Sequence, residues 1–408
     1  MENTKVKNTI QAELLAPAGN YQKLQTAFRF GADAAYVGGK QFSLRTFADN
    51  FTMEELTSAV SMAHSLGKKL YVTANIFGRN ADFVLLEDYF KRLEEIGVDA
   101  AIISDPGVIY AAKKSAPNLP IHLSTQANTT NKYAVKFWGE QGIERVVLAR
   151  ELSLKEIAEI HDFAPETELE AFVHGAMCIS YSGRCLLSDY LDGRSSNRGA
   201  CVQSCRWRYE VRALNATNGQ SEWLPMEEDD RGTYVFNSKD LNMLAYLKEM
   251  EGAGVRSFKI EGRMKSEYYL ATVINAYRRL MDGGDFTISE TELSNVAHRD
   301  YTTAYALGKN TETVNYENSQ SKGDAIYIAD IVGCADGFVF AEMRNRFKKG
   351  DVLEVLSPDD NFSKSFTVDE IFDSKGEATD DAKLVQEIYK IKCPYTLKEG
   401  DYLRRKKA

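Results

Sequence analysis

The chain lacks any apolar run long enough to cross a membrane. Of its 408 residues 44% are hydrophobic, yet no stretch reaches the roughly 18 consecutive apolar residues of a transmembrane helix. The amino-terminal residues also lack the apolar segment and small-residue cleavage site of a secretory signal. We therefore expect a cytoplasmic protein with no membrane partner.

Histidine and the common catalytic motifs are scarce. The chain has five histidines and contains no His-Glu-x-x-His or Gly-x-Ser-x-Gly sequence. These absences remove the usual signatures of zinc metalloproteases and serine hydrolases. No Gly-x-Gly-x-x-Gly turn follows a predicted strand, which argues against a dinucleotide-binding sheet.

An excess of positive charge is also missing. The 50 lysines and arginines are outnumbered by 59 acidic residues, for a net charge of -9. This balance argues against a uniform basic coat for nucleic acid, but it leaves room for local patches. One such patch is the run Arg404 to Lys407 near the end of the chain.

What the chain does have is a regular alternation of short apolar runs and helical patterns over its first three quarters. Helices are predicted at 53–66, 83–95, 132–141, 154–162 and 241–253. Strands are predicted at 14–17, 34–38, 69–75, 100–104, 121–126, 145–148, 169–174 and 257–261. Alternating strands and helices give a parallel sheet with right-handed crossovers, and eight units are the number that closes a barrel. The expected fold is an α/β (β/α)8 TIM-like barrel, with an open doubly wound sheet as the alternative.

One unit is interrupted by an insertion at 176–236, after the seventh strand. A good N-cap run at 237–240 predicts that the next helix opens there. Because the loops after barrel strands all emerge on the catalytic face, the insertion is expected to lie over the mouth of the barrel. A small hairpin is expected near its end.

A smaller second domain is expected at the carboxyl end. The barrel with its insertion is assigned to 1–312, a polar linker to 313–324, and an all-β small-barrel domain to 325–408. Its predicted strands are 325–331, 337–342, 351–356, 365–371, 382–388 and 401–403.

The insertion contains four of the six cysteines, Cys178, Cys185, Cys201 and Cys205, within 28 residues. In a reducing cytosol clustered thiols indicate metal ligands or redox groups more than disulfides. Zinc usually uses short Cys-x2-Cys knuckles, whereas the gaps here are six, fifteen and three residues. An iron–sulfur cluster accepts wider and uneven gaps. Zinc, disulfides and inert buried thiols remain the alternatives.

Several long segments resemble one known family. They are ELLAPAG at 13–19, EAFVHGAMCISYSGRCLLS at 170–188, NRGACVQSCRW at 197–207 and FKIEGRMK at 258–265. These sequences are similar to the signature of the collagenase-like proteins catalogued as peptidase family U32. The likeness covers the whole predicted barrel.

The resemblance implies a function. Members of this family include dioxygen-independent hydroxylases that depend on an iron–sulfur cluster, and the length and the β domain are most similar to the branch that hydroxylates tRNA. The implied cofactor is a 4Fe-4S cluster, with zinc as the alternative. The implied partners are the tRNA anticodon loop, prephenate and an electron donor of unknown identity. The implied product is 5-hydroxyuridine at the wobble position.

Candidate residues for this chemistry follow the strand ends. A dianion such as prephenate needs convergent cations. The candidates for this role are Arg45, Arg150, Arg263 and Lys265. His174, Glu261, Asp105 and Gln126 share the same face and are candidates for proton transfer or orientation, and a support role for the cysteine loop is equally open for His174.

An RNA-binding segment is predicted directly after the last cysteine. Arg206, Trp207, Arg208 and Tyr209 alternate basic and aromatic side chains, as nucleic-acid contacts often do. The same four residues would also make an ordinary amphipathic strand. A collagenase-like peptidase, or a non-catalytic RNA-binding protein with a structural metal site, are the competing functions.

Overall fold

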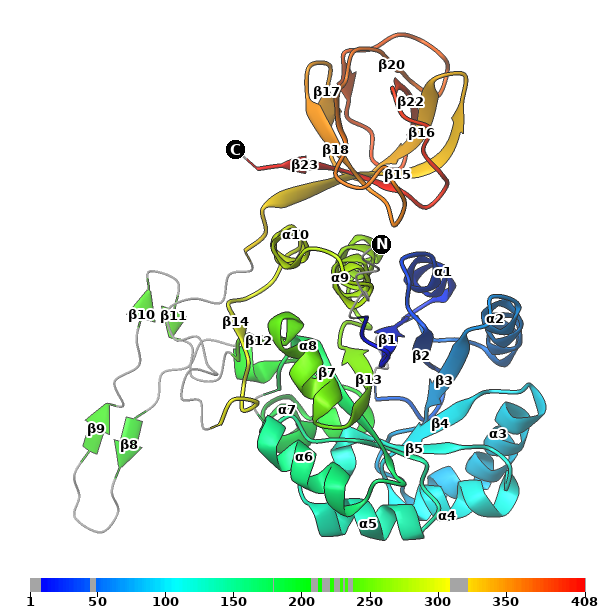
Figure 1. Cartoon of the computed structure of the whole chain (residues 1–408), viewed down its shortest axis with the longest axis vertical. Coiled ribbons are helices and arrows are strands. Elements are labelled where there is room, and N and C mark those ends of the chain that lie inside the picture. Colours follow the sequence, from blue (N-terminus) through cyan, green and yellow to red (C-terminus); the bar gives the residue numbers. More distant parts are fainter. Residues whose placement is uncertain are drawn as a thin grey trace, which may run out of the picture.

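The computed structural model describes residues 9–44, 49–178, 180–206, 238–308 and 322–407, together with the strand segments 212–214, 221–223, 228–229 and 232–233. Eight parallel strands form a closed barrel, in which the eighth strand pairs with both the first and the seventh (Figure 1). These strands are β1 (Glu13–Pro17), β2 (Ala34–Gly38), β3 (Lys69–Thr73), β4 (Ala100–Ile103), β5 (Ile121–Leu123), β6 (Arg145–Val147), β7 (Glu168–Ala176) and β13 (Val255–Ile260). The predicted barrel is confirmed.

A layer of helices surrounds the barrel (Figure 1). They are α1 (Tyr21–Arg29), α2 (Met53–Ser65), α3 (Phe83–Glu95), α4 (Pro106–Ser115), α5 (Lys132–Glu140), α6 (Leu154–Phe163), α8 (Leu247–Gly252) and α9 (Glu267–Met281). Local sequence sets several starts: Thr52 with Glu55, and Ser153 with Glu156, form capping boxes that satisfy the first backbone N–H groups of α2 and α6. None of the helices in the described part of the chain is long and apolar enough to cross a membrane.

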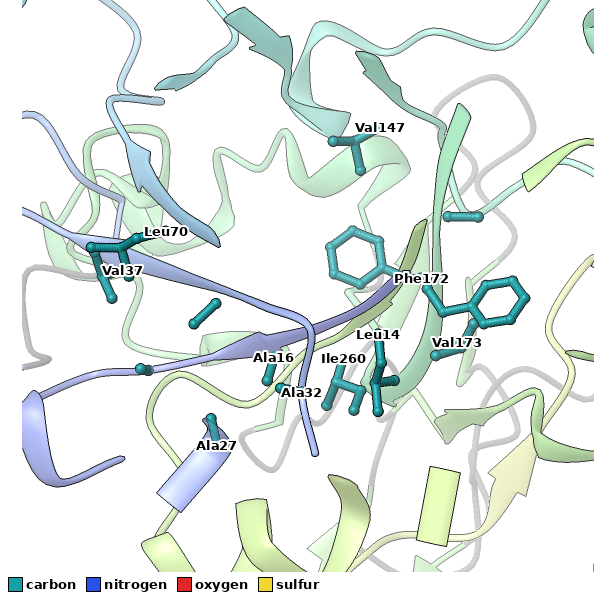
Figure 2. Packing of buried hydrophobic residues seen from close by; sticks show 14 of the residues in the cluster. Leu14, Ala16, Ala27, Ala32, Val37, Leu70, Val147, Phe172, Val173 and Ile260 are labelled. Carbon is teal, nitrogen blue, oxygen red and sulfur yellow. The ribbon is translucent and has the colours of Figure 1, made fainter. Parts of the chain in front are cut away.

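The main hydrophobic core lies between the strands and this helical layer. Alternate strand residues such as Leu14, Val37 and Ile260 pack outward against the helices, and Figure 2 shows these side chains around β1, β2 and β13. Side chains on the opposite face of each strand fill the interior of the barrel. The apolar residues of each strand therefore form the barrel wall, and the loops that leave the carboxyl ends of the strands form the catalytic face.

The barrel interior contains buried charges. Glu170 is fully buried and accepts hydrogen bonds from Lys259 at 2.6 Å and from Arg145 at 3.2 Å. Arg145 also donates to Glu13 at 2.6 Å. Burial alone would raise the pKa of Glu13, but the charge and hydrogen bonds of Arg145 outweigh it and lower that pKa. These ionic groups stabilise one another and lie toward the amino ends of β1 and β6.

The predicted helix at 241–253 is partly wrong. Residues Asp240–Asn242 form a short strand, β12, that pairs antiparallel with β7 and parallel with β14 (Tyr301–Thr302). The helix α8 begins only at Leu247, after the 3-10 turn η6 (Leu244–Tyr246). Asp240 does not cap a helix: Arg299 donates to its carboxylate and lowers its pKa against the opposing effect of burial. A partner 59 residues away thus overrides the local N-cap signal.

The insertion leaves the barrel from the end of β7. It contains α7 (Leu187–Asp192) and two antiparallel strand pairs, β8 (Arg212–Leu214) with β9 (Ser221–Trp223) and β10 (Glu228–Asp229) with β11 (Gly232–Thr233). Both pairs lie outside the barrel wall in Figure 1.

The carboxyl-terminal domain is an antiparallel all-β unit with its own core. Its seven-stranded sheet has the order β19-β18-β23-β15-β16-β22-β20, and β17 pairs with β21. The strands are β15 (Ala325–Ala335), β16 (Phe338–Met343), β17 (Phe347–Lys348), β18 (Val352–Leu356), β19 (Ser365–Thr367), β20 (Ile371–Phe372), β21 (Asp381–Ala382), β22 (Ile388–Lys392) and β23 (Tyr402–Lys406). The predicted strand at 365–371 is two strands, and the one predicted at 382–388 is only the end of β21 and the start of β22, with residues 383–387 between them outside any strand.

This domain is fixed to the barrel by buried contacts. Arg404 of β23 is 1% exposed and donates two hydrogen bonds of 2.7 Å to Glu292 of α10 (Phe286–Leu293). Tyr268 of α9 stacks on Tyr327 of β15 with ring centroids 4.9 Å apart. The basic run at the end of the chain thus supplies an interdomain contact through Arg404.

Candidate active site and cysteine loop

The cysteine loop is tied to the catalytic face of the barrel by hydrogen bonds to three strand-end loops. The Ser182 N–H donates to Glu151, which follows β6, at 2.9 Å, and the Ser182 hydroxyl bonds to Asn128 at 2.7 Å. The Arg184 Nε donates to the carbonyl of Gln126, after β5, at 2.7 Å. Arg198 bonds to Asp82, in the loop after β3, at 3.0 Å. The loop therefore covers the mouth of the barrel, as the position of the insertion predicted.

The chain reaches this loop through a close approach of two strands. Gly175, in β7, has φ of +106°, and a Cβ atom there would lie 2.4 Å from the carbonyl oxygen of Glu261. The N–H of Glu261 in turn donates to the carbonyl of His174 at 2.9 Å. Only glycine fits this position, because any side chain would push β7 and β13 apart.

No disulfide joins the four cysteines of the loop to any described residue. Cys178 and Cys201 are exposed, whereas Cys185 and Cys205 are partly buried. Backbone N–H groups of Leu187 and Gln203 point at the sulfurs of Cys185 and Cys201, at 3.3 and 3.4 Å. Within the described residues no three His, Cys, Asp or Glu side chains converge on a single-ion site.

Four cysteine thiols are a donor set that suits an iron–sulfur cluster and also a zinc ion. Peptide N–H groups directed at sulfur would stabilise thiolate ligands of either kind.

Arg150 lies between the cysteine loop and the barrel mouth. Its guanidinium stacks over the ring of Phe172 at 3.8 Å and donates to the carbonyl of Ala176 at 3.3 Å. The Glu261 carboxylate is 3.7 Å away. The structure thus brings Arg150, Glu261 and the end of β7, two residues before Cys178, together.

Arg263 lies on another side of the mouth. It is buried and donates to Thr73 at 3.0 Å, to Ser43 at 2.8 Å and to Asn50 at 3.0 Å. These three residues belong to the ends of β2 and β3 and the loop between them. The surroundings hold the guanidinium in one orientation.

Gln126 and Asp105 have separate roles in the structure. Gln126 is buried in the 3-10 turn η2 (Thr125–Ala127), and its side-chain oxygen accepts a 3.0 Å hydrogen bond from Asn75. Asp105 is the N-cap of α4 and accepts from the N–H groups of Gly107 and Val108 at 2.8 and 3.1 Å. Helix capping thus occupies the Asp105 carboxylate.

His174 lies outside the barrel interior. It is 1% exposed, and the rings of Tyr269, Tyr277 and Tyr301 surround it at centroid distances of 5.5 to 6.2 Å. A register shift between Lys259 and Ile260 adds one residue to β7, and such a bulge turns consecutive side chains to the same side of a strand. Burial lowers the pKa of His174 to about 3, so the imidazole is neutral at neutral pH.

This environment predicts a pH dependence of stability. The unfolded chain binds a proton on His174 below pH about 6.5, whereas the native protein binds it only near pH 3. Stability should therefore fall as the pH drops from 6.5 toward 3. In a His174→Gln variant the loss of stability that comes from protonation of His174 should be absent. The free energy of unfolding of each protein at pH 8 is the reference. Urea unfolding across this range measures it, and an unchanged slope would contradict the assignment.

Of the remaining predicted site residues, Lys265 and Arg206 lie within the part of the chain that the structure describes. Lys265 lies over the ring of Tyr269 at 4.8 Å, beside the tyrosine cluster. Arg206 ends the turn η5 (Ser204–Arg206), whereas Arg45, Trp207, Arg208 and Tyr209 lie outside the described residues.

Four residues that hold the cysteine loop or the side chains at the barrel mouth were not predicted from the sequence. Asn75, Asn128, Glu151 and Arg184 all make the contacts described above. Three of them follow strands β3, β5 and β6, so the rule that strand ends carry function could have found them.

A closed parallel barrel whose mouth is covered by a loop with four cysteines defines a class of (β/α)8 barrel enzymes with a cysteine-rich lid. The family model described as "Peptidase family U32" matches residues 19–316, and "Peptidase family U32 C-terminal domain" matches 324–404. The chain belongs to peptidase family U32.

Several relatives have names that refer to RNA modification. The chain is 41% identical over 415 residues to tRNA hydroxylation protein P1 of Bacillus subtilis strain 168, covering 98% of this chain and 96% of that protein. It is 38% identical to tRNA hydroxylation protein P of Escherichia coli strain K12, over 90% of each chain. It is also 36% identical to the 23S rRNA 5-hydroxycytidine C2501 synthase of the same strain, over 66% of this chain and 39% of that protein.

Proposed function

We propose that this protein is a tRNA hydroxylase that forms 5-hydroxyuridine at the wobble position without dioxygen. The observation that carries the proposal is the four-cysteine loop over the mouth of a barrel whose sequence is similar, along nearly its whole length, to a protein named for tRNA hydroxylation. The proposed cofactor is a 4Fe-4S cluster, and the proposed co-substrate is prephenate.

Cys178, Cys185, Cys201 and Cys205 would hold the cluster. A bound cluster of this type supplies one-electron transfer. The backbone N–H groups of Leu187 and Gln203, which point at the sulfurs of Cys185 and Cys201, would stabilise the thiolate ligands. Arg150 would offset part of the negative charge of the site. Anchoring by Ser182 and Arg184 keeps this loop in place over the mouth.

Arg150 and Arg263 are the proposed ligands of the prephenate carboxylates. Arg263 is held by neutral oxygen atoms, and Arg150 by the Phe172 ring, the Ala176 carbonyl and Glu261, so each guanidinium has a defined direction at the mouth. Arginine suits this task because its planar fork binds a carboxylate with two parallel hydrogen bonds. Glu261, 3.7 Å from Arg150, would orient that guanidinium or accept a proton.

The wobble uridine is a suitable substrate because it lies in an unpaired loop. Little stacking energy is lost when such a base turns into a pocket. If water supplies the oxygen atom, replacing the C5 hydrogen by a hydroxyl group releases two protons to solvent and two electrons. Without dioxygen a second compound must accept these two electrons. The proposal therefore includes an electron acceptor, which is prephenate or an external redox partner.

A peptidase function has less support. Peptide hydrolysis needs an activated nucleophile beside a base, or a metal-bound water. His174 is enclosed by tyrosines, and burial keeps its pKa near 3, which is unsuitable for a general base at neutral pH.

Nucleoside analysis of tRNA tests the proposal. In a strain that lacks this gene and any redundant enzyme, 5-hydroxyuridine-type nucleosides at the wobble position should disappear, and the wild-type gene should restore them. Arg150→Gln should restore less than about 1% of the wild-type level, because one lost charge-assisted pair in a closed site costs about 3 kcal/mol. Arg346→Gln, on the surface of the β domain, is the control. Unchanged nucleosides in the deletion strain would refute the function.

A further inference from the structure

The short helix α7, between Cys185 and Cys201, buries a serine and exposes apolar side chains. Its buried residue is Ser188, whose hydroxyl donates to the carbonyl of Arg194 at 2.7 Å and accepts from the N–H of Val202 at 3.2 Å. Leu186 and Tyr190, one turn apart, are 68% and 88% exposed, and Leu191 is also exposed. The loop thus buries a serine of α7 and leaves the apolar side chains of Leu186, Tyr190 and Leu191 in solvent, where Asp189 and Asp192 are also exposed.

Packing among the described residues does not account for the exposed Tyr190. In the described part of the chain no aromatic ring or cation contacts Tyr190. By comparison, Tyr133, which is also exposed, lies against Phe163 at 5.0 Å and Lys132 at 5.8 Å. Exposed apolar groups that lie together on a rigid support commonly mark a binding surface.

The support under this face is rigid and close to the mouth. The side chains of Ser196 and Asn197 both donate to the carbonyl of Cys185, just before α7. Arg184, with an exposed side chain, is bonded to the carbonyl of Gln126 at the mouth. A ligand on the outer face of α7 would therefore be held beside the opening of the barrel.

Charge and shape favour a nucleic acid base over a phosphate as the ligand. Arg184 and Arg194 flank the helix, but α7 also carries Asp189 and Asp192, and Arg194 pairs with Asp192 at 3.3 Å. The local charge is thus nearly balanced, and backbone phosphates gain little from it. Flat aromatic and apolar side chains instead suit the faces of unpaired bases, which stack on any aromatic ring.

We propose that the exposed face of α7, formed by Leu186, Tyr190 and Leu191, is a stacking platform for unpaired nucleotides next to the base that enters the barrel. This proposal rests on the proposed RNA-modifying function and adds to it the surface that selects a single-stranded loop. Its ligand is RNA with unpaired bases, not duplex RNA.

Binding of a synthetic anticodon stem-loop to the purified holoprotein tests the platform. Tyr190→Ala should weaken binding by about 5-fold to 150-fold, the effect of losing one stacked base, measured by fluorescence anisotropy. Tyr190→Phe should bind as the wild type does, and Tyr190→Leu should fall between the two. The dependence of affinity on salt should stay the same in all variants, because stacking releases no counterions.

Three controls distinguish stacking on Tyr190 from a general loss of RNA affinity or of folded protein. Tyr110→Ala, at a 73% exposed tyrosine on α4, should leave affinity unchanged. A fully paired duplex of the same length should bind wild type and Tyr190→Ala equally. Thermal unfolding of Tyr190→Ala should match the wild type, since the side chain is in solvent.

Equal stem-loop affinity in wild type and Tyr190→Ala would overturn the proposal, as would an equal loss for the duplex. A change in oligomeric state with unchanged RNA affinity would assign this face to contact with a second copy of the chain and would also overturn it. None of these binding results requires turnover, so they are independent of the nucleoside analysis that tests the function itself.

Discussion

Replacing Cys178 by serine is expected to abolish wobble hydroxylation and to remove the iron–sulfur cluster from the protein. A serine oxygen is a poor substitute for a thiolate ligand, and a cluster with three remaining thiolates is exposed to loss of iron. Anaerobically purified wild-type protein should contain about four irons and four sulfides. The variant should lack the visible absorption of thiolate-bound iron. Nucleoside analysis should then show a loss of at least 100-fold in 5-hydroxyuridine.

Cys334→Ser is the matched control for this experiment. Cys334 lies in β15 of the carboxyl-terminal domain, among apolar residues and away from the four-cysteine loop. Its replacement should leave iron, sulfide, absorption and hydroxylation unchanged. A colourless wild-type protein with one bound zinc ion would contradict the cofactor assignment, and hydroxylation that survives Cys178→Ser would separate the loop from the chemistry.

Replacing Glu170 by leucine is expected to destabilise the protein by about 3–5 kcal/mol. Glu170 is fully buried inside the barrel and holds Lys259 at 2.6 Å and Arg145 at 3.2 Å. Without this carboxylate Lys259 loses its anionic partner in a region of low polarity. The cost is large because a buried charge without a partner keeps its desolvation penalty. Urea unfolding, followed by far-UV circular dichroism, measures the change.

A double variant separates the lost pairing from lost packing. Glu170→Leu with Lys259→Met removes both charges and keeps the volumes similar, so it should recover most of the lost stability. Arg145 keeps Glu13 as its partner in that protein. Glu87→Ala, which breaks an exposed pair with Lys114, should cost at most about 1 kcal/mol. A double variant as unstable as Glu170→Leu would show that packing, not pairing, dominates.

The barrel itself could be predicted from local patterns. Most strand residues are buried on both faces, and several helices have their own side-chain caps, such as Thr52 with Glu55, so these signals lie within a few neighbouring residues. The prediction failed where a distant partner decided the conformation. Asp240 is the last residue of the predicted N-cap run at 237–240, but pairing of β12 with β7 and the ion pair with Arg299 make the following segment a strand.

Part of the candidate site could also be predicted. The order of strands located Arg150, Glu261 and Gln126 at the mouth, since parallel strands end on one face. The same rule gave no warning that Asp105 caps α4 or that a bulge turns His174 away from the interior. The alternation of side chains along a strand predicts neither effect, because one depends on the start of a helix and the other on an extra residue in β7.

The sequence by itself determined the fold class, the family and the presence of four cysteines in one loop. Strand and helix periods, the cysteine spacing and the long motifs are all local properties of the sequence. Only the tertiary structure decided what each residue does there. It paired Arg150 with Glu261, enclosed His174 in tyrosines, joined Arg404 to Glu292 and turned Tyr190 into solvent. The reason is physical: burial and charge pairing depend on residues far apart in the chain, and only folding brings them together.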